Sequence, residues 1–345
     1  MAESLNIDIT HNDLQQTKDN IFFIVGTSRS GSTLFQSMLS SHSKVIVPPE
    51  THYFYSREVV NQAFDEAVDK EEFCRKLIDF WYTGKTRIGD LGLDRDEVIS
   101  HAERLKLWSP LELYVLHLTL YRKHHNKEIL GEKTPLHILH VDEILEDFPD
   151  ARIISMFRDP RAASYSEIKA YFGSPSVLVT TDRWKRYVKV HFEKQEELPS
   201  HKYMMMRYWE LVRHTEDKLQ QVSDFLGIEY EQQMLEYYKR DEKGFAKGER
   251  EWKKGTLKPI QQGKNKEWRK ALKYWQVALI EEHADHFMPD MGYEPTVKRL
   301  SFFKKWFYVA VDVRRSYWAT FTNARDEGYS EPQEFVEALE KESAD

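Results

Sequence analysis

Short apolar runs recur along the chain and predict the strands of a buried sheet. Residues 21–25 read I-F-F-I-V and end at Gly26, and a shorter run at 45–47 ends at two prolines. Runs that are apolar throughout are typical of parallel strands covered on both faces. Three later runs are interpreted in the same way, at residues 129–131, 152–157 and 202–207.

Apolar residues at spacings of three and four predict helices between these strands. Residues 53–128 carry this pattern throughout, so we expect several helices and no strand there. Further helices are expected at about 34–39, 160–171, 216–225, 267–286 and 300–322. Strands that alternate with helices predict an α/β fold, a parallel sheet flanked by helices, with 53–128 as a helical insertion or cap.

The same pattern divides the chain into three parts. Residues 1–20 are polar and aperiodic, and we expect a mobile tail there. The folded domain is expected to cover 21–298, followed by a helical extension over 299–345. The 300–322 helix sets aromatic residues beside lysines and arginines, which would suit a membrane surface. We favour the alternative that its apolar face packs on the domain, because an amphipathic face is first of all a core-facing feature.

Composition narrows the class of protein. The chain has 345 residues, of which 41% are hydrophobic, and 50 Lys and Arg against 57 Asp and Glu give a net charge of −7. This balance argues against a nucleic-acid partner but leaves room for a local basic pocket. No apolar stretch is long enough to span a membrane, no signal peptide is apparent, and the single cysteine, Cys74, excludes an intrachain disulfide. These features together predict a cytoplasmic location.

A glycine loop follows the first strand. Residues 26–33 read G-T-S-R-S-G-S-T, the glycine spacing of a phosphate-binding P-loop, with a serine in place of its lysine. The glycines let backbone N–H groups point inward, the next helix adds the positive end of its dipole, and the arginine adds a forked cationic donor. This arrangement favours an anion site over an ordinary glycine turn. Its predicted members are Gly26, Thr27, Ser28, Arg29, Ser30, Gly31, Ser32 and Thr33.

A second anion site is predicted after the strand at 152–157. Arg158 follows the strand, and Ser166 comes eight residues later on the next helix. The guanidinium can form a fork to a phosphate, and the hydroxyl can donate beside it. Alone, this pattern would indicate a surface Arg–Asp pair at a helix start. In order after the glycine loop, it favours an anion site.

The two motifs together resemble the 5′-phosphosulfate loop and the 3′-phosphate motif of sulfotransferases that use 3′-phosphoadenosine 5′-phosphosulfate (PAPS). The resemblance implies a P-loop NTPase-like sheet, PAPS as donor, 3′,5′-adenosine bisphosphate (PAP) as product and no required metal. It also implies transfer of a sulfuryl group to a hydroxyl, or less readily an amine, of a small molecule, glycan or lipid. Two weaker matches place Tyr208 near the adenine ring and Lys264 near the 3′-phosphate.

The same resemblance supplies catalytic candidates. Glu50, in V-P-P-E-T-H-Y, matches the glutamate base of the bacterial-type, tyrosyl-protein and carbohydrate branches, and His52 is a rival base. Lys133, in G-E-K-T-P, matches a lysine that contacts the sulfuryl oxygens, and Arg29 is expected beside the same group. His137 stays a candidate because the cytosolic branch uses a histidine base in this region.

Two other functions stay open. A P-loop kinase or NTPase would share the glycine loop, but Ser32 replaces its lysine and no clear Walker-B aspartate follows an apolar strand. A non-catalytic nucleotide-binding protein would not need Glu50 or Lys133. The insertion contains no motif that identifies the acceptor.

Overall fold

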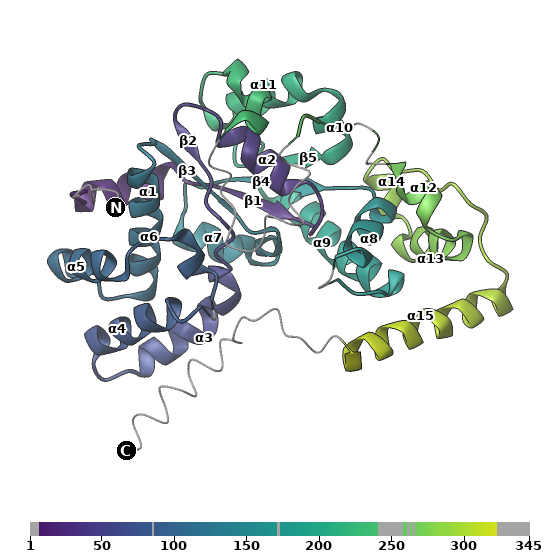
Figure 1. Ribbon diagram of the computed structural model, residues 1–345, viewed down its shortest axis with the longest axis horizontal. Coiled ribbons are helices and arrows are strands. Elements are labelled where there is room, and N and C mark those ends of the chain that lie inside the picture. The colour runs from purple at the N-terminus through teal and green to yellow at the C-terminus, as the bar shows by residue number, and fades with distance from the viewer. Residues whose placement is uncertain are drawn as a thin grey trace.

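The computed structural model describes residues 7–84, 86–170, 173–240, 258–260, 263 and 266–322, with side chains described up to residue 315. Five strands form one parallel sheet in the order β2-β3-β1-β4-β5 (Figure 1). The strands are β1 Phe22–Gly26, β2 Val45–Ile46, β3 Ile129–Lys133, β4 Arg152–Phe157 and β5 Tyr203–Arg207. Each predicted run overlaps a strand, and the predicted α/β fold with a parallel sheet is confirmed.

Helices connect and cover the strands. Up to the end of the insertion they are α1 His11–Asn20, α2 Ser32–Leu39, α3 Tyr53–Glu66, α4 Lys70–Trp81, η1 Ile88–Leu91, α5 Arg95–Leu105 and α6 Pro110–His124. After β3 they are η2 Pro135–His140, α7 Val141–Asp147, α8 Pro160–Ile168, α9 Val177–Glu197, α10 Tyr208–Arg213, α11 Thr215–Leu226, η3 Gln232–Lys239, α12 Trp268–Ala271, α13 Tyr274–Ala284, α14 Phe287–Asp290 and α15 Phe302–Thr322. The described residues of 53–128 form helices and no strand, as predicted, while their role as an acceptor cap stays a prediction.

Strand β1 lies at the centre of the sheet and is buried along its whole length. Successive side chains of a strand point to opposite faces. Phe22 and Ile24 accordingly pack with the apolar residues of α2 and α11, whereas Phe23 and Val25 pack with those of α6, α7 and α9. Two layers of helices therefore enclose the sheet (Figure 1). The loops at the carboxyl ends of the strands, where α/β sheets bind ligands, remain to build a site.

The N-terminal segment differs from the expected mobile tail, because its residues 11–20 form helix α1. Thr10 and Asp13 form a capping box at its start. Leu14 and Thr17 are buried, and the hydroxyl of Thr17 accepts a hydrogen bond from Thr119 of α6 at 2.9 Å. The buried side of α1 is narrow and partly polar, so hydrophobic periodicity does not reveal it.

Two further differences concern helices after β4. Helix α9 was not expected, because charged residues recur along most of its turns and only a stripe that includes Trp184, Val188 and His191 is buried. The helix expected over 267–286 is two helices, α12 and α13, since Leu272 and Lys273 adopt extended backbone between them.

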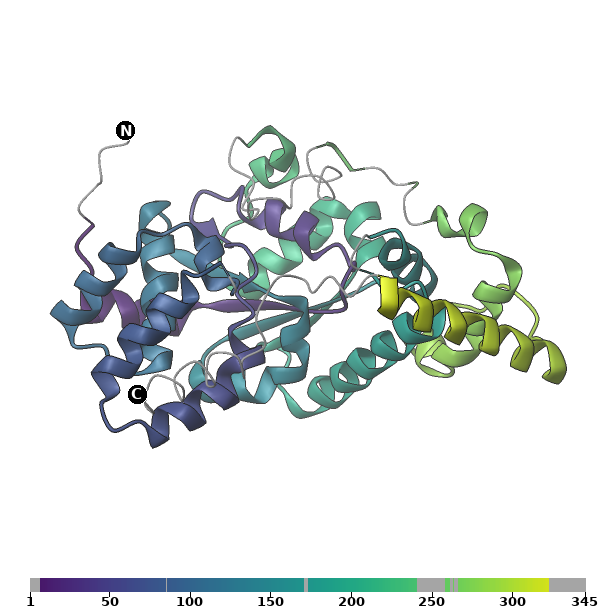
Figure 2. The ribbon, with the colours of Figure 1, turned by 60° about the horizontal axis from the view of Figure 1, so that its bottom comes forward.

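Helix α15 covers the end of the domain that lies opposite the insertion, beside α9 and α13 (Figures 1 and 2). Only one of its sides packs: Tyr308 stacks on Trp275 with ring centroids 5.1 Å apart, and Asp312 is fully buried. Phe302, Phe303, Trp306 and Phe307 are exposed instead. The prediction that the apolar face of this helix packs on the domain is therefore wrong for these four residues. In the part of the chain that the structure describes, no helix is long and apolar enough to cross a membrane.

Candidate active site

The glycine loop connects the central strand to helix α2. Gly26 has φ 131°, and a Cβ atom there would lie 2.1 Å from the carbonyl oxygen of Met156 on β4. Gly31, the N-cap of α2, has φ 93°, and its Cβ would lie 2.3 Å from the ring of Tyr208. Positive φ and close neighbours exclude larger residues at both positions. The loop is thus held tightly between the ends of β4 and β5.

Two hydroxyl groups of the glycine loop form no hydrogen bond with the rest of the described structure. The side-chain oxygens of Thr27 and Ser30 are buried and have no hydrogen-bond partner among the described residues. Buried hydroxyls normally find a partner, because an unsatisfied one costs about 1–3 kcal/mol. With the N-terminus of α2 behind them, these groups fit a bound anion. A phosphate bound in the loop could accept hydrogen bonds from both hydroxyls.

The two predicted anion sites are neighbours. Arg29 Nε donates to Ser166 Oγ at 3.1 Å, and Arg158 Nη1 lies 3.4 Å from the carbonyl oxygen of Arg29. The guanidinium of Arg158 also lies over the ring of Tyr208, 4.6 Å from its centroid. Residues that are up to 179 positions apart in sequence are brought into one cluster by the ends of β1, β4 and β5.

Electrostatics in this cluster favour a negative ligand. Burial lowers the pKa of Arg29, and the nearby charge of Arg158 lowers it further, while Glu167 and Glu50 oppose the shift. Burial likewise lowers the pKa of Arg158. Two guanidinium groups so close together repel each other, and an anion between them would relieve that repulsion.

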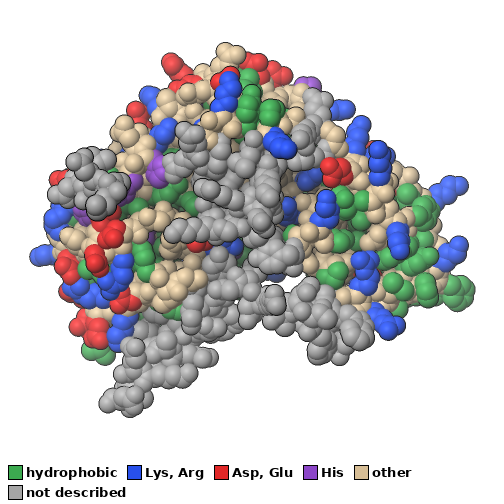
Figure 3. Space-filling model, in the orientation of Figure 1, with side chains coloured by type: hydrophobic (Ala, Val, Ile, Leu, Met, Phe, Trp, Pro, Cys, Tyr) green, Lys and Arg blue, Asp and Glu red, His purple; other side chains and the backbone are tan. Residues whose placement is uncertain are grey.

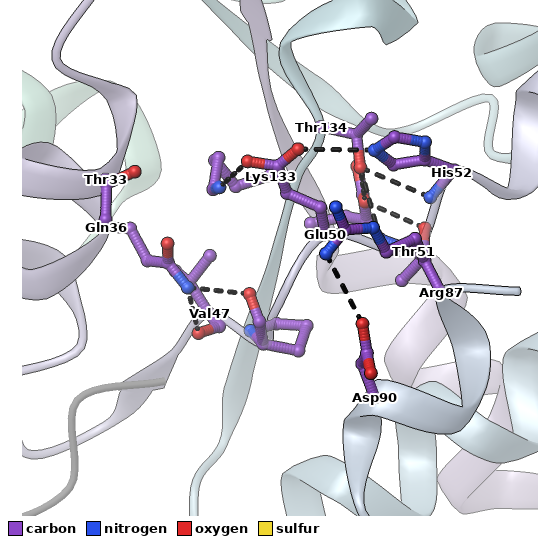
Figure 4. Close-up of polar contacts among 12 residues, drawn as sticks. Thr33, Gln36, Val47, Glu50, Thr51, His52, Arg87, Asp90, Lys133 and Thr134 are labelled. Atoms are coloured by element: carbon purple, nitrogen blue, oxygen red, sulfur yellow. Dashed lines mark hydrogen bonds and ion pairs between the residues drawn. The ribbon is translucent and has the colours of Figure 1, made fainter. Parts of the chain in front are cut away.

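Glu50 lies in the loop after β2, between two cationic or polar partners. Its carboxylate forms an ion pair with Lys133 at the end of β3, and its other oxygen is 3.3 Å from His52 Nε2 (Figure 4). Lys133 is fully buried, while Glu50 and His52 are about a quarter exposed. The Glu50 carboxylate is therefore accessible to an acceptor, and the lysine approaches it from inside the protein.

A buried carboxylate, Glu132, holds the Glu50–Lys133 pair in place through hydrogen bonds to neighbouring residues. It accepts hydrogen bonds from the hydroxyls of Thr51 at 2.9 Å and Thr134 at 2.6 Å, and it pairs with His137 Nδ1 at 3.0 Å. Burial would raise the pKa of Glu132, but His137 and the two hydroxyls outweigh it and lower the pKa. Because Thr51 follows Glu50 and Glu132 precedes Lys133, this network fixes both members of the ion pair.

Hydrogen bonds also connect the loop that carries Glu50 to helix α2, which follows the glycine loop. The amide of Gln36 on α2 donates to the carbonyl oxygens of Val47 at 3.1 Å and Pro48 at 2.7 Å (Figure 4). Sequence reasoning missed both Gln36 and Glu132. A polar residue on an otherwise apolar helix, and an acid inside a buried strand, were the available signals.

The candidate residues do not all reach this cluster. His137 is fully buried against Glu132, with Phe54 in edge contact, so it does not face the Glu50 carboxylate from an accessible surface. Burial lowers the pKa of His137, although the charge and hydrogen bond of Glu132 act to raise it. The prediction that His137 is a catalytic base is not supported by this position. Lys264 lies outside the described residues, so its predicted contact stays a prediction.

Metal binding was not expected from the sequence. Among the described residues, no three or more His, Cys, Asp or Glu side chains are grouped so that they could hold a metal ion. The chemistry available at the cluster is instead that of cationic and hydroxyl donors for an anion, next to a carboxylate that can accept a proton.

Comparison with known proteins agrees with the fold and the motifs. Residues 22–232, more than half of the chain, match the model of the sulfotransferase family. The chain is 24% identical over 241 residues to protein-tyrosine sulfotransferase 2 of Gallus gallus, which covers 68% of this chain and 58% of that protein. It is 26% identical over 222 residues to protein-tyrosine sulfotransferase 1 of Danio rerio, over 63% of this chain and 56% of that protein. The chain thus spans little more than half the length of these curated relatives.

Solved structures show the same fold. The sulfotransferase domain of the Synechococcus PCC 7002 olefin synthase superposes with a TM-score of 0.57 at 19% identity, over 80% of this chain and 95% of that one. The sulfotransferase domain from the curacin biosynthetic pathway gives 0.55 at 19% identity, over 80% and 99% of the two chains.

The curated relatives correct one expectation. Protein-tyrosine sulfotransferases are membrane enzymes of the Golgi, so the prediction of a cytoplasmic location is wrong by this comparison. The composition that suggested it, a single cysteine and a polar start, does not distinguish compartments at this level.

Proposed function

Because the chain belongs to the sulfotransferase family, we propose that it transfers a sulfuryl group from PAPS to a hydroxyl of an acceptor, with Glu50 as general base. One observation carries the proposal. The glycine loop and the Arg158–Ser166 pair form one cationic cluster, and Arg29 of that cluster lies within electrostatic range of the carboxylate of Glu50.

The donor would be held at two points. The loop from Gly26 to Thr33 and the N-terminus of α2 would receive the 5′-phosphosulfate, where the buried hydroxyls of Thr27 and Ser30 lack partners. Arg158 and Ser166 would hold the 3′-phosphate, and Tyr208 would contribute its ring beside them. Two such anion positions side by side would match a donor that carries a phosphosulfate and a second phosphate.

The transfer needs a proton acceptor and charge stabilisation. Glu50 would take the proton of the acceptor hydroxyl while that oxygen forms its bond to sulfur. The bond from sulfur to the bridging oxygen of the donor breaks, and PAP leaves. Lys133, the ion-pair partner of Glu50, and Arg29 would stabilise the sulfuryl oxygens and the charge that grows on the bridging oxygen.

The acceptor remains at the level of a hydroxyl group. The sequence led us to expect a small molecule, glycan or lipid, and the names of the curated relatives add a tyrosine of a protein to these classes. The decisive screen offers labelled PAPS with one acceptor of each class. Transfer of label to none of the four would contradict the proposal that the chain is an active sulfotransferase.

Donor binding is tested by PAP-induced stabilisation. A ligand that binds only the folded state raises the melting temperature, so PAP should raise it more than ATP with magnesium does. Arg158→Ala removes a charge-assisted fork and should weaken PAP binding by about 2–3 kcal/mol, while Ser166→Ala should cost about 1 kcal/mol. Arg186→Ala, an exposed arginine of α9, is the matched control. Calorimetry that shows equal PAP affinity in Arg158→Ala and Arg186→Ala would refute the donor site, and a preference for ATP with magnesium would favour a kinase.

A further inference from the structure

Helix α15 has two functional sides. On one side, Lys305 pairs with Glu282 at 2.6 Å, and Tyr308 stacks on Trp275 of α13. On the same side, Asp312 accepts hydrogen bonds from the hydroxyl of Ser176 and from the first backbone N–H groups of α9. These residues are three to four positions apart and form one stripe, which anchors the helix to the domain.

The other side carries aromatic residues that nothing in the described structure covers. The exposed fractions are 69% for Phe302, 84% for Phe303, 58% for Trp306 and 63% for Phe307, and Val313 continues the side at 55%. Phe303, Phe307 and Arg314 follow at spacings of four and seven, so they share a stripe. Exposed apolar area of this size and continuity marks an interaction surface. Figure 3 shows hydrophobic side chains interspersed with basic ones at the end of the molecule where α15 lies.

The charges around this side have one sign. The segment 298–315 contains six basic residues: Lys305 pairs with Glu282 on the anchored side, and the other five are Lys298, Arg299, Lys304, Arg314 and Arg315. Its single acidic residue is Asp312, which is buried and faces α9. The whole chain, in contrast, carries a net charge of −7. A positive aromatic surface on a negative protein would be drawn to an anionic surface in one orientation.

We propose that the exposed side of α15 binds the surface of an anionic phospholipid bilayer. The helix would lie in the plane of the interface, with Phe303 and Phe307 among the acyl chains and Trp306 at headgroup level. Lys304 and Arg314 would contact the lipid phosphates. A second copy of the chain is the less suitable occupant, because a symmetric contact between two such helices would bring their basic residues together.

Vesicle binding tests the proposal on the full chain. The protein is sedimented with vesicles of phosphatidylcholine alone and with vesicles that contain about one third phosphatidylserine, at low and at high salt. We expect binding to the anionic vesicles only, and its loss at high salt. Lys304→Gln with Arg314→Gln should lower the partition coefficient roughly 30-fold, at about fivefold for each charge. Phe303→Ser with Phe307→Ser should abolish binding to the anionic vesicles at low salt, where the unmodified chain binds.

Controls separate this surface from folding and from self-association. Val68→Ser and Tyr55→Ser remove exposed apolar side chains from the insertion end and should leave vesicle binding unchanged. PAP-induced stabilisation should persist in both α15 variants, which shows that they fold. Three results would overturn the proposal: equal binding to neutral and anionic vesicles, no binding by the unmodified chain, or a dimer in sedimentation velocity that Phe303→Ser with Phe307→Ser dissociates.

Discussion

Replacement of Glu50 by glutamine separates proton transfer from donor binding. Glutamine keeps the size of the side chain and a hydrogen-bonding oxygen, but it cannot accept the acceptor's proton. General-base catalysis contributes about 10²- to 10⁴-fold, so kcat should fall by that factor, equivalent to about 2.7–5.4 kcal/mol in the barrier.

The structure adds a second, opposite expectation for the same variant. Glu50 is the carboxylate partner of Lys133, which is fully buried. Without that carboxylate, the ammonium group gains more from an incoming anion, and the repulsion between Glu50 and the donor disappears. PAP affinity should therefore stay the same or increase while kcat falls, and the melting temperature without PAP should fall.

The assay is single-turnover transfer from labelled PAPS, with PAP affinity measured by calorimetry on the same samples. Glu58→Gln, an exposed carboxylate on α3, is the matched control and should leave both quantities unchanged. His52→Ala and His137→Ala complete the series. Near-normal kcat in Glu50→Gln together with a large loss in His52→Ala would show that the base is the histidine and refute the reasoning.

Three further results are expected. Activity should persist in excess EDTA, because in the proposed reaction cationic side chains would take the place of a metal at the transferring group. Full loss on chelation and recovery with magnesium would favour a kinase. Burial lowers the pKa of His117 and of His191 to about 4, below their value of about 6.5 in the unfolded chain. The contribution of each histidine to the free energy of unfolding is therefore complete above pH 6.5 and falls by on the order of 3 kcal/mol as the pH drops toward 4. Urea unfolding at several pH values would measure this loss. A free energy of unfolding that does not change with pH would contradict the expectation. Glu132→Ala leaves three buried donors without their acceptor, so it should lower the free energy of unfolding by about 3 kcal/mol or more and reduce kcat, whereas an unchanged melting temperature would contradict the bracing role.

Sequence reasoning reached the parts of this molecule that depend on local pattern. The strand before Gly26 and the strand before Arg158 are apolar runs, and the residues after them follow known spacings. It did not reach parts that depend on contacts across the fold. An acidic residue such as Glu132 is not expected in a buried strand, and only the fold shows that Thr51 donates a hydrogen bond to it. Helix α1 is apparent only once α6 covers Thr17.

Helix α15 shows the same limit of sequence-based prediction. Its periodicity predicts an apolar face, but periodicity does not say what covers that face. The structure assigns the packing to Tyr308 and Asp312 and leaves the phenylalanines outside. The sequence therefore predicts which residues of the helix share one face, but only the folded structure shows whether that face is buried or exposed.

The position of Asp312 has a consequence for how such a protein can evolve. This residue belongs to α15, yet it closes the first turn of α9, and Thr180 of α9 donates to Ser164 on the helix that carries Ser166. A lineage that exchanged α15 for another surface segment would lose the acceptor of the first two N–H groups of α9 and keep only the cap that Ser176 provides. Substitutions on the outer side of α15 would leave the start of α9 intact as long as Asp312 is kept.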